Sequence, residues 1–125
     1  MAAASLDLYL EQGATFRRVL TFKDKNGVLQ DLTGYVFTGQ IRKTANDATL
    51  LASMVCTVLN QVTNKGEVEI LISAGNTSLI PVAKSKTAKK EPIDYAYDIE
   101  RLAPDTITKV RIIEGIMKVS PEVTK

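Results

Sequence analysis

The sequence has no histidine and no tryptophan, and it has one cysteine among 125 residues. Histidine is the usual general base near neutral pH and the commonest metal ligand, so its absence argues against catalytic triads and zinc-activated water in their usual form. The lone Cys56 has no second cysteine with which to form an internal disulfide. It could supply only one of the four ligands that a structural zinc site needs. We therefore expect no enzymatic activity, no cofactor and no metal, with Cys56 on a buried strand.

A strong charge imbalance and long apolar runs are also missing. Sixteen basic and 14 acidic side chains give a net charge of +2, which is too weak to require a polyanionic partner. No run approaches the roughly 18 apolar residues of a membrane span. The start, Met-Ala-Ala-Ala-Ser-Leu-Asp, has neither the basic nor the apolar region of a secretory signal. We expect synthesis in the cytoplasm and no membrane association, and nucleic acid is not favoured as a partner.

The dominant pattern is an alternation of apolar and polar residues, which is typical of half-buried strands. It is clearest over residues 66–73 and 93–101, where Tyr95 and Tyr97 fall on the apolar face. These two tyrosines are expected to fill the space between two sheets. Similar patterns predict further strands near residues 6–10, 16–22, 35–42, 54–59 and 109–119.

The alternation over residues 109–119 changes phase in the middle. Val110 and Ile112 share one face, whereas Met117 and Val119 have the opposite parity. One extra residue near 113–115 would restore a single buried face, so we predict a β-bulge there. A central strand covered on both faces is the alternative, and it needs no bulge.

Turn signals separate the runs and bound the fold. Their spacing of about 8–12 residues favours one all-β domain over residues 1–125, an antiparallel sandwich or barrel of seven to eight strands with short terminal arms at 1–5 and 120–125. Helix is minimal: Asn76 is expected to cap one turn before Pro81, and residues 45–54 fit a short helix or an irregular strand. The turns lie at residues 24–27 (Asp-Lys-Asn-Gly), 33–34, 64–66 and 103–105.

Two charged clusters were weighed as functional sites. Asp94, Asp98 and Glu100 share one strand face, which suggests a calcium site or a glycosidase pair. A solvated polar face with lysine partners is favoured instead. The second cluster lies in a stretch without aromatic residues, so a solvated loop is favoured there, ahead of an acidic protein partner or nucleic acid. Its lysines are Lys84, Lys86, Lys89 and Lys90.

Short phrases in a fixed order give the chain a resemblance to a known family. They run from Gln-Gly-Ala-Thr-Phe (12–16) through Asp-Leu-Thr-Gly-Tyr (31–35), Gln-Ile-Arg (40–42) and Tyr-Asp-Ile-Glu (97–100) to Val-Ser-Pro-Glu-Val-Thr (119–124). In this series the chain resembles the N-terminal domain of siphophage baseplate upper proteins, a family of tailed-phage virion proteins. The resemblance implies an immunoglobulin-like β-sandwich.

The resemblance also implies a function. It points to a structural protein of the virion, an adaptor that joins the tail or baseplate to fibres or neighbouring subunits. The implied partners are other virion proteins, with further copies of the chain in the assembled particle. A capsid decoration protein and a stand-alone carbohydrate-binding module remain as alternatives. The candidate partner contacts are the four lysines above together with Glu122, Val123 and Thr124.

Overall fold

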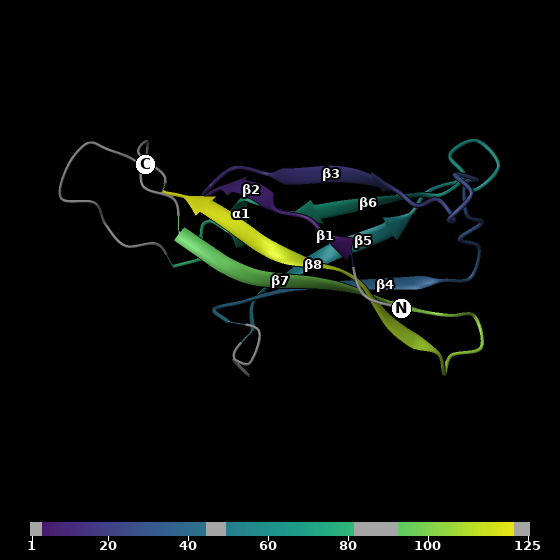
Figure 1. Cartoon of the computed structure of the whole chain (residues 1–125). Coiled ribbons are helices and arrows are strands. Elements are labelled where there is room, and N and C mark those ends of the chain that lie inside the picture. The colour runs from purple at the N-terminus through teal and green to yellow at the C-terminus, as the bar shows by residue number, and fades with distance from the viewer. Residues whose placement is uncertain (1–3, 45–49, 82–92, 122–125) are drawn as a thin grey trace.

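The computed structural model of the chain describes residues 4–44, 50–81 and 93–121. Strands dominate this part, with one four-residue helix, α1 (Ala74–Thr77) (Figure 1). The prediction of an all-β fold with seven to eight strands and minimal helix is confirmed. The strands are β1 (Ala4–Ser5), β2 (Leu8–Glu11), β3 (Phe16–Thr21), β4 (Val36–Arg42), β5 (Leu50–Val58), β6 (Glu67–Ile72), β7 (Ile93–Leu102) and β8 (Lys109–Ser120).

The strands form one mixed sheet in the order β1-β8-β7-β4-β5-β6-β3, and β2 also pairs with β8. β1 and β2 run parallel to β8, and the remaining pairings are antiparallel. β5 belongs to both halves of the sheet, because its first part pairs with β4 and residues 55–58 pair with β6. The sheet therefore curls, so that β3 and β6 lie opposite β7 and β8 (Figure 1).

The core fills the inside of this curl. Leu8, Ile41, Ile70 and Met117 come from four different strands, and all are fully buried. The expected alternation holds, since Val68, Ile70 and Ile72 are buried while the residues between them are only partly buried. Apolar side chains from both halves thus pack together, which supplies the main driving force for the curl.

Tyr95 and Tyr97 are buried on the inner face of β7, as expected. Their hydroxyl groups donate hydrogen bonds to the backbone oxygens of Pro81 and Leu6, respectively. A buried phenol needs such a partner, because an unpaired hydroxyl in an apolar site is costly. Burial raises the pKa of Tyr97 to about 12. The charge of Asp7 adds a smaller increase, and the charge of Arg18 opposes it.

A bulge interrupts β8, as the change of phase predicted. Ile99 of β7 pairs with Ile113, whereas Glu100 pairs with Arg111, so Ile112 is the extra residue. The bulge lies one position before the expected range of 113–115. It places Ile113, Met117 and Val119 together on the buried face.

The helix prediction was wrong about the cap. The turn begins after Ser73, whose hydroxyl oxygen accepts the Asn76 N–H at 3.2 Å, so Asn76 lies inside α1. Thr77 anchors the turn in this register, because its buried hydroxyl donates to the Ala14 carbonyl and accepts the Gly13 N–H. Of the range 45–54, residues 50–54 are strand, and 45–49 lie outside the described residues.

The terminal arms are part of the sheet where the structure describes them. Ala4 and Ser5 pair with Ile113 and Glu114 of β8, and Ser120 ends that strand. Between β1 and β2 the chain passes very close to Gly115, where a Cβ atom would lie 2.1 Å from the Leu6 oxygen. The remaining residues of the two expected arms, 1–3 and 122–125, lie outside the described residues.

Candidate functional site

Three connecting loops gather at one end of the sheet. They comprise residues 22–35 after β3, 59–66 after β5 and 103–108 after β7. The antiparallel pairings make β3, β5 and β7 run in the same direction, so their following loops leave at the same end. We call this surface the loop end, and it lies on the right in Figure 1. Loops placed by a rigid scaffold often carry binding functions.

Each of these loops contains a tight turn held by an Asp or Asn side chain. Such side chains favour turns because their oxygen can accept backbone N–H groups a few residues ahead. At the loop end, three such side chains each accept the N–H of an apolar residue as well as that of a polar residue. Asp24 accepts from Val28 at 3.0 Å, Asn60 accepts from Val62 at 2.8 Å, and Asp105 accepts from Ile107 at 2.8 Å.

The apolar side chains at these turns are exposed to solvent. Val28 is 57% exposed, Val62 is 92% exposed and Ile107 is 83% exposed. Removing apolar surface from water lowers the free energy of the system. Because the turn bonds already order the backbone, a partner that covers these side chains loses less free energy to loop ordering.

The three loops are also joined to one another. The side-chain oxygen of Gln61 accepts the Leu32 N–H at 2.9 Å and the Gly66 N–H at 3.0 Å, which links the second loop to the first. Gly34 lies against Pro104 of the third loop, where a Cβ atom would come within 3.0 Å of the proline ring. The loop end is therefore one continuous surface.

The phrase Asp-Leu-Thr-Gly at 31–34 contacts both of the other loops, through Leu32 and Gly34. The carboxylate of Asp31 accepts the Thr33 hydroxyl at 2.6 Å and the Thr33 N–H at 3.0 Å. These hydrogen bonds lower the pKa of Asp31. Gly34 has φ of +82°, and Leu32 is fully buried. The phrase thus ties the loop to the core.

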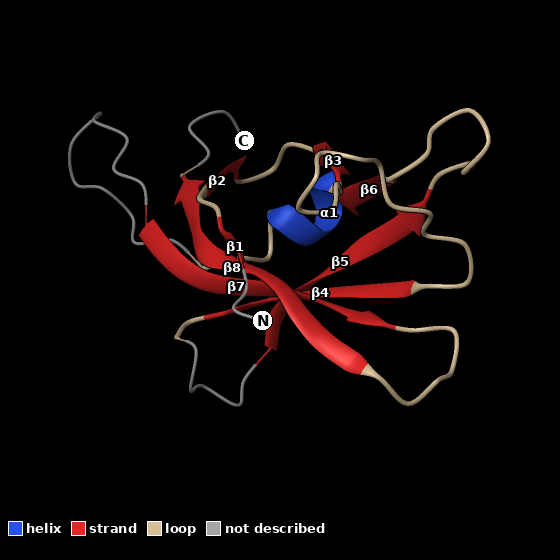
Figure 2. Cartoon of the chain, turned by 45° about the vertical axis from the view of Figure 1, so that its right-hand side comes forward, coloured by secondary structure: helices blue, strands red, loops and turns tan. Residues whose placement is uncertain are grey.

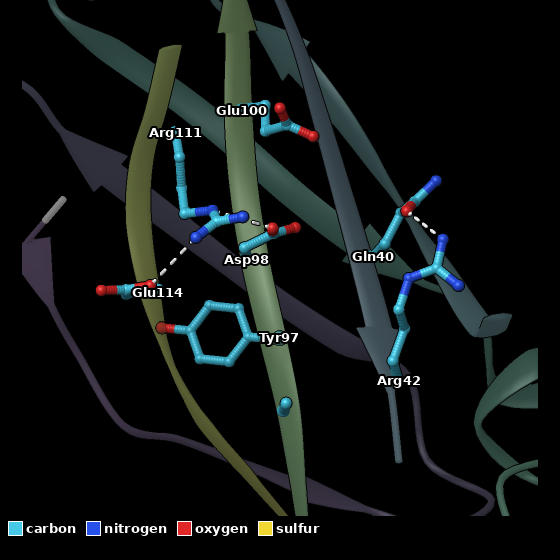
Figure 3. Close-up of a pocket in the computed structure, with 8 residues that line it drawn as sticks. Gln40, Arg42, Tyr97, Asp98, Glu100, Arg111 and Glu114 are labelled. Atoms are coloured by element: carbon cyan, nitrogen blue, oxygen red, sulfur yellow. Dashed lines mark hydrogen bonds and ion pairs between the residues drawn. The ribbon is translucent and has the colours of Figure 1, made fainter. Parts of the chain in front are cut away.

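A second feature is a polar hollow of about 250 Å³ on the outer face of β4, β7 and β8 (Figure 3). Arg111 lies between two carboxylates, with nitrogen–oxygen distances of 3.1 Å to Asp98 and 3.4 Å to Glu114. The partner of Asp98 is thus an arginine rather than the expected lysine, because the bulge in β8 brings Arg111 beside it. Asp94 is opposite Lys118 on the neighbouring strand. In the described part of the chain, no group of histidine, cysteine, aspartate and glutamate side chains could hold a metal ion.

The remaining sequence-based candidates are placed only in part. Cys56 is half-buried against the core, and its burial raises the pKa of the thiol to about 11. No helix in residues 4–44, 50–81 and 93–121 is long and apolar enough to cross a membrane. The candidate contacts Lys84, Lys86, Lys89, Lys90, Glu122, Val123 and Thr124 lie outside the described residues.

The loop end is a site that the sequence patterns did not predict. The predicted turns at 24–27 and 103–105 lie there, but no prediction covered the apolar residues that follow them. The available signal was an Asp or Asn two to four residues before a lone Val or Ile in a loop, as in Asn60 and Val62. That signal becomes meaningful only when the topology brings the loops together.

No protein-family model matches the chain, and no curated protein matches it. Inference about function therefore rests on the geometry of the chain and on the phrases of its sequence.

Proposed function

We propose that this chain is a structural protein of a tailed-phage particle, an adaptor of the tail or baseplate that joins neighbouring subunits or fibres by protein–protein contacts. The observation that carries the proposal is the loop end, where ordered turns hold Val28, Val62 and Ile107 in solvent. The phage assignment is supported by the ordered series of sequence phrases.

The exposed side chains are sufficient for a weak contact. Burying one fully exposed valine or isoleucine side chain contributes about 1.5–3 kcal/mol, so three of them contribute at most roughly 4.5–9 kcal/mol before the loss of translational freedom. One such contact alone binds weakly. Repeated contacts in a closed ring strengthen each other, because each later contact forms at high effective concentration. This size of interaction suits a subunit that assembles in several copies.

An immunoglobulin-like sandwich is part of the same proposal. Two features of the sheet support it. The antiparallel strands fall into two halves that face each other, with β5 crossing between them. The loops after β3, β5 and β7 also gather at one end, as binding loops do in immunoglobulin domains.

The test has two parts. First, purified particles of the phage that encodes the chain are examined by mass spectrometry and by immunogold labelling. We expect the protein in the particle, with gold on the tail or baseplate, and its absence from particles would overturn the proposal. Label on the capsid would favour a decoration protein instead.

Second, the loop end is tested by substitution. The double variant Val62→Ser, Ile107→Ser is compared with Val55→Ser, a matched control that is 60% exposed on a strand of the sheet. Light scattering after size exclusion gives the solution mass, and pull-down against disassembled particles gives partner capture. We expect self-assembly or capture to be lost in the double variant and kept in the control. Binding of the wild type to a glycan array, without capture of any virion protein, would favour the carbohydrate-binding module.

A further inference from the structure

The first part of β8 has an open edge. β1 covers Ile113 and Glu114, and β2 pairs from Met117 onward. Among the described residues, positions 109–112 pair only with β7 on the other side. Figure 2 shows that the first part of β8 extends beyond β1, on the side of the loop that joins β7 to β8. An open strand edge presents unpaired N–H and C=O groups that can pair with an added strand.

A groove of about 320 Å³ runs beside this edge. We call it the edge groove, and its opposite wall is the end of β3 with the residues that follow. Phe22 forms part of the wall and is held in place by stacking on Phe37 at 5.5 Å between ring centres. The lining residues are Ala4, Thr21, Phe22, Lys23, Gln30, Arg101, Val110, Arg111, Ile112 and Ile113.

The charged residues that line the edge groove are all basic. Its lining contains Lys23, Arg101 and Arg111 but no acidic side chain. Arg111 is already paired with two carboxylates on the outer face of the sheet. Arg101 instead contacts two neutral groups, since it donates to the Gln30 side chain at 3.0 Å and lies 5.1 Å from the centre of the Tyr35 ring.

Among the described residues, the edge groove thus combines a strand edge without a partner, apolar walls and two basic side chains, Lys23 and Arg101, that take part in no ion pair. We propose that it accepts an extended segment of a partner protein, with alternating apolar side chains and at least one carboxylate. The segment adds to β8 as a strand in line with β1. Its apolar side chains contact Phe22 and Ile112, and its carboxylate pairs with Arg101. The open edge of four residues spans about 13 Å, which suits a short segment. This binding mode does not depend on the phage assignment.

The test uses two synthetic peptides that differ in one charge. The probe is acetyl-Ser-Val-Thr-Asp-Thr-Val-Ser-amide, which places the aspartate on the same strand face as the valines, and the match replaces its aspartate by lysine. Each is titrated to about millimolar concentration into isotope-labelled full-length protein, because NMR shifts detect binding with a Kd as weak as about 1 mM. We expect the acidic peptide to shift the amide signals of Val110, Arg111 and Ile112. It should bind about fivefold tighter than the lysine peptide, as a partly exposed ion pair implies.

Substitutions then assign the preference to the edge groove. Arg101→Gln should reduce the ratio of the two affinities to near one. Lys23 is exposed, so Lys23→Gln removes a charge at the rim of the edge groove without disturbing the core. It should lower the ratio of the two peptide affinities in part, even if Arg101→Gln folds poorly. Lys25→Gln, in the same loop but outside the lining, is the matched control and should change nothing. Val62→Ser, Ile107→Ser should also bind the peptide normally, which separates this inference from the proposed function.

Several outcomes would overturn the inference. They are equal affinity for the two peptides, an absence of shifts along β8, and shifts confined to the outer face of the sheet. If the acidic peptide binds only after Ala2 and Ala3 are deleted, the edge groove belongs to the N-terminal residues of the chain itself. Shifts at Val110 and Ile112 that depend on protein concentration without peptide would assign the groove to a second copy.

Discussion

Gly115 provides the sharpest test of how the first strands dock on β8. A Cβ atom at this position would lie 2.1 Å from the oxygen and 2.8 Å from the carbon of the Leu6 carbonyl. To reach normal contact the Leu6 backbone must retreat by about 1 Å. Backbone held between two strands cannot turn aside as a flexible side chain does. Gly115→Ala is therefore expected to push the link between β1 and β2 away from the sheet.

The size of the effect follows from what the moved carbonyl loses. It accepts the Tyr97 hydroxyl, and leaving that buried phenol unpaired costs about 1–3 kcal/mol. In the variant, the neighbouring hydrogen bond from the Leu6 N–H to the Glu114 oxygen, which is 3.1 Å long in the native protein, would be strained as well. Overpacking in a filled site has a cost of similar size. We expect the free energy of unfolding to fall by about 2–4 kcal/mol, or roughly 10 °C in Tm for a domain of this length.

Urea unfolding followed by circular dichroism measures this difference. The matched control is Gly75→Ala in α1, where an added Cβ meets no atom within 4 Å. Alanine is the better helix former, so the control should be unchanged or more stable by up to about 1 kcal/mol.

A second measurement reports on the contact itself. The pKa of Tyr97, about 12 in the native protein, should fall toward its ordinary value of 10.0 once the hydroxyl reaches water. Tyrosinate absorbance gives this titration. If Gly115→Ala stays within about 0.5 kcal/mol of the control and the Tyr97 titration does not move, the proposed backbone contact is wrong.

Three further predictions concern the loop end and the core. Leu32→Ala should lower the free energy of unfolding in urea by about 2–5 kcal/mol, because Leu32 is fully buried, and a loss below about 1 kcal/mol would contradict its role as the anchor of the loop. Cys56 should react with iodoacetamide at pH 8 about 100-fold more slowly in the native protein than in the unfolded chain, because a pKa of about 11 leaves little thiolate; equal rates would show an open thiol. The hydrogen bonds that Asp31 and Asp105 accept lower the pKa of each carboxyl group below 3.8 in the folded state. The stability that these bonds contribute is therefore complete above that pH, and it is lost as the pH falls through the lowered pKa values. The double variant Asp31→Asn, Asp105→Asn should therefore show a shallower loss of stability in acid, and an unchanged acid profile would rule out these carboxylates as its source.

Local signals in the sequence were enough for most of the strands and turns. Alternation placed Tyr95 and Tyr97 on the buried face, because the period of two belongs to the strand itself. The phase change predicted the bulge that Ile112 forms, since one buried face demands one extra residue. The bonds of Asp31 to Thr33 were also predictable, because they join residues two positions apart. In each case the predictive signal lies in residues close together in the sequence.

The sites depend on contacts that join distant parts of the chain, and only the tertiary structure decided these. β5 pairs with β4 and then with β6, and this switch curls the sheet and sets which loops meet at the loop end. The edge groove exists because β3 ends opposite the open edge of β8, where Arg101 meets Gln30 across 71 positions of sequence. Many strand pairings satisfy the same alternation, and the packing of the whole core selects among them. A residue pattern therefore determined which faces are buried, while the folded sheet determined which exposed groups lie together.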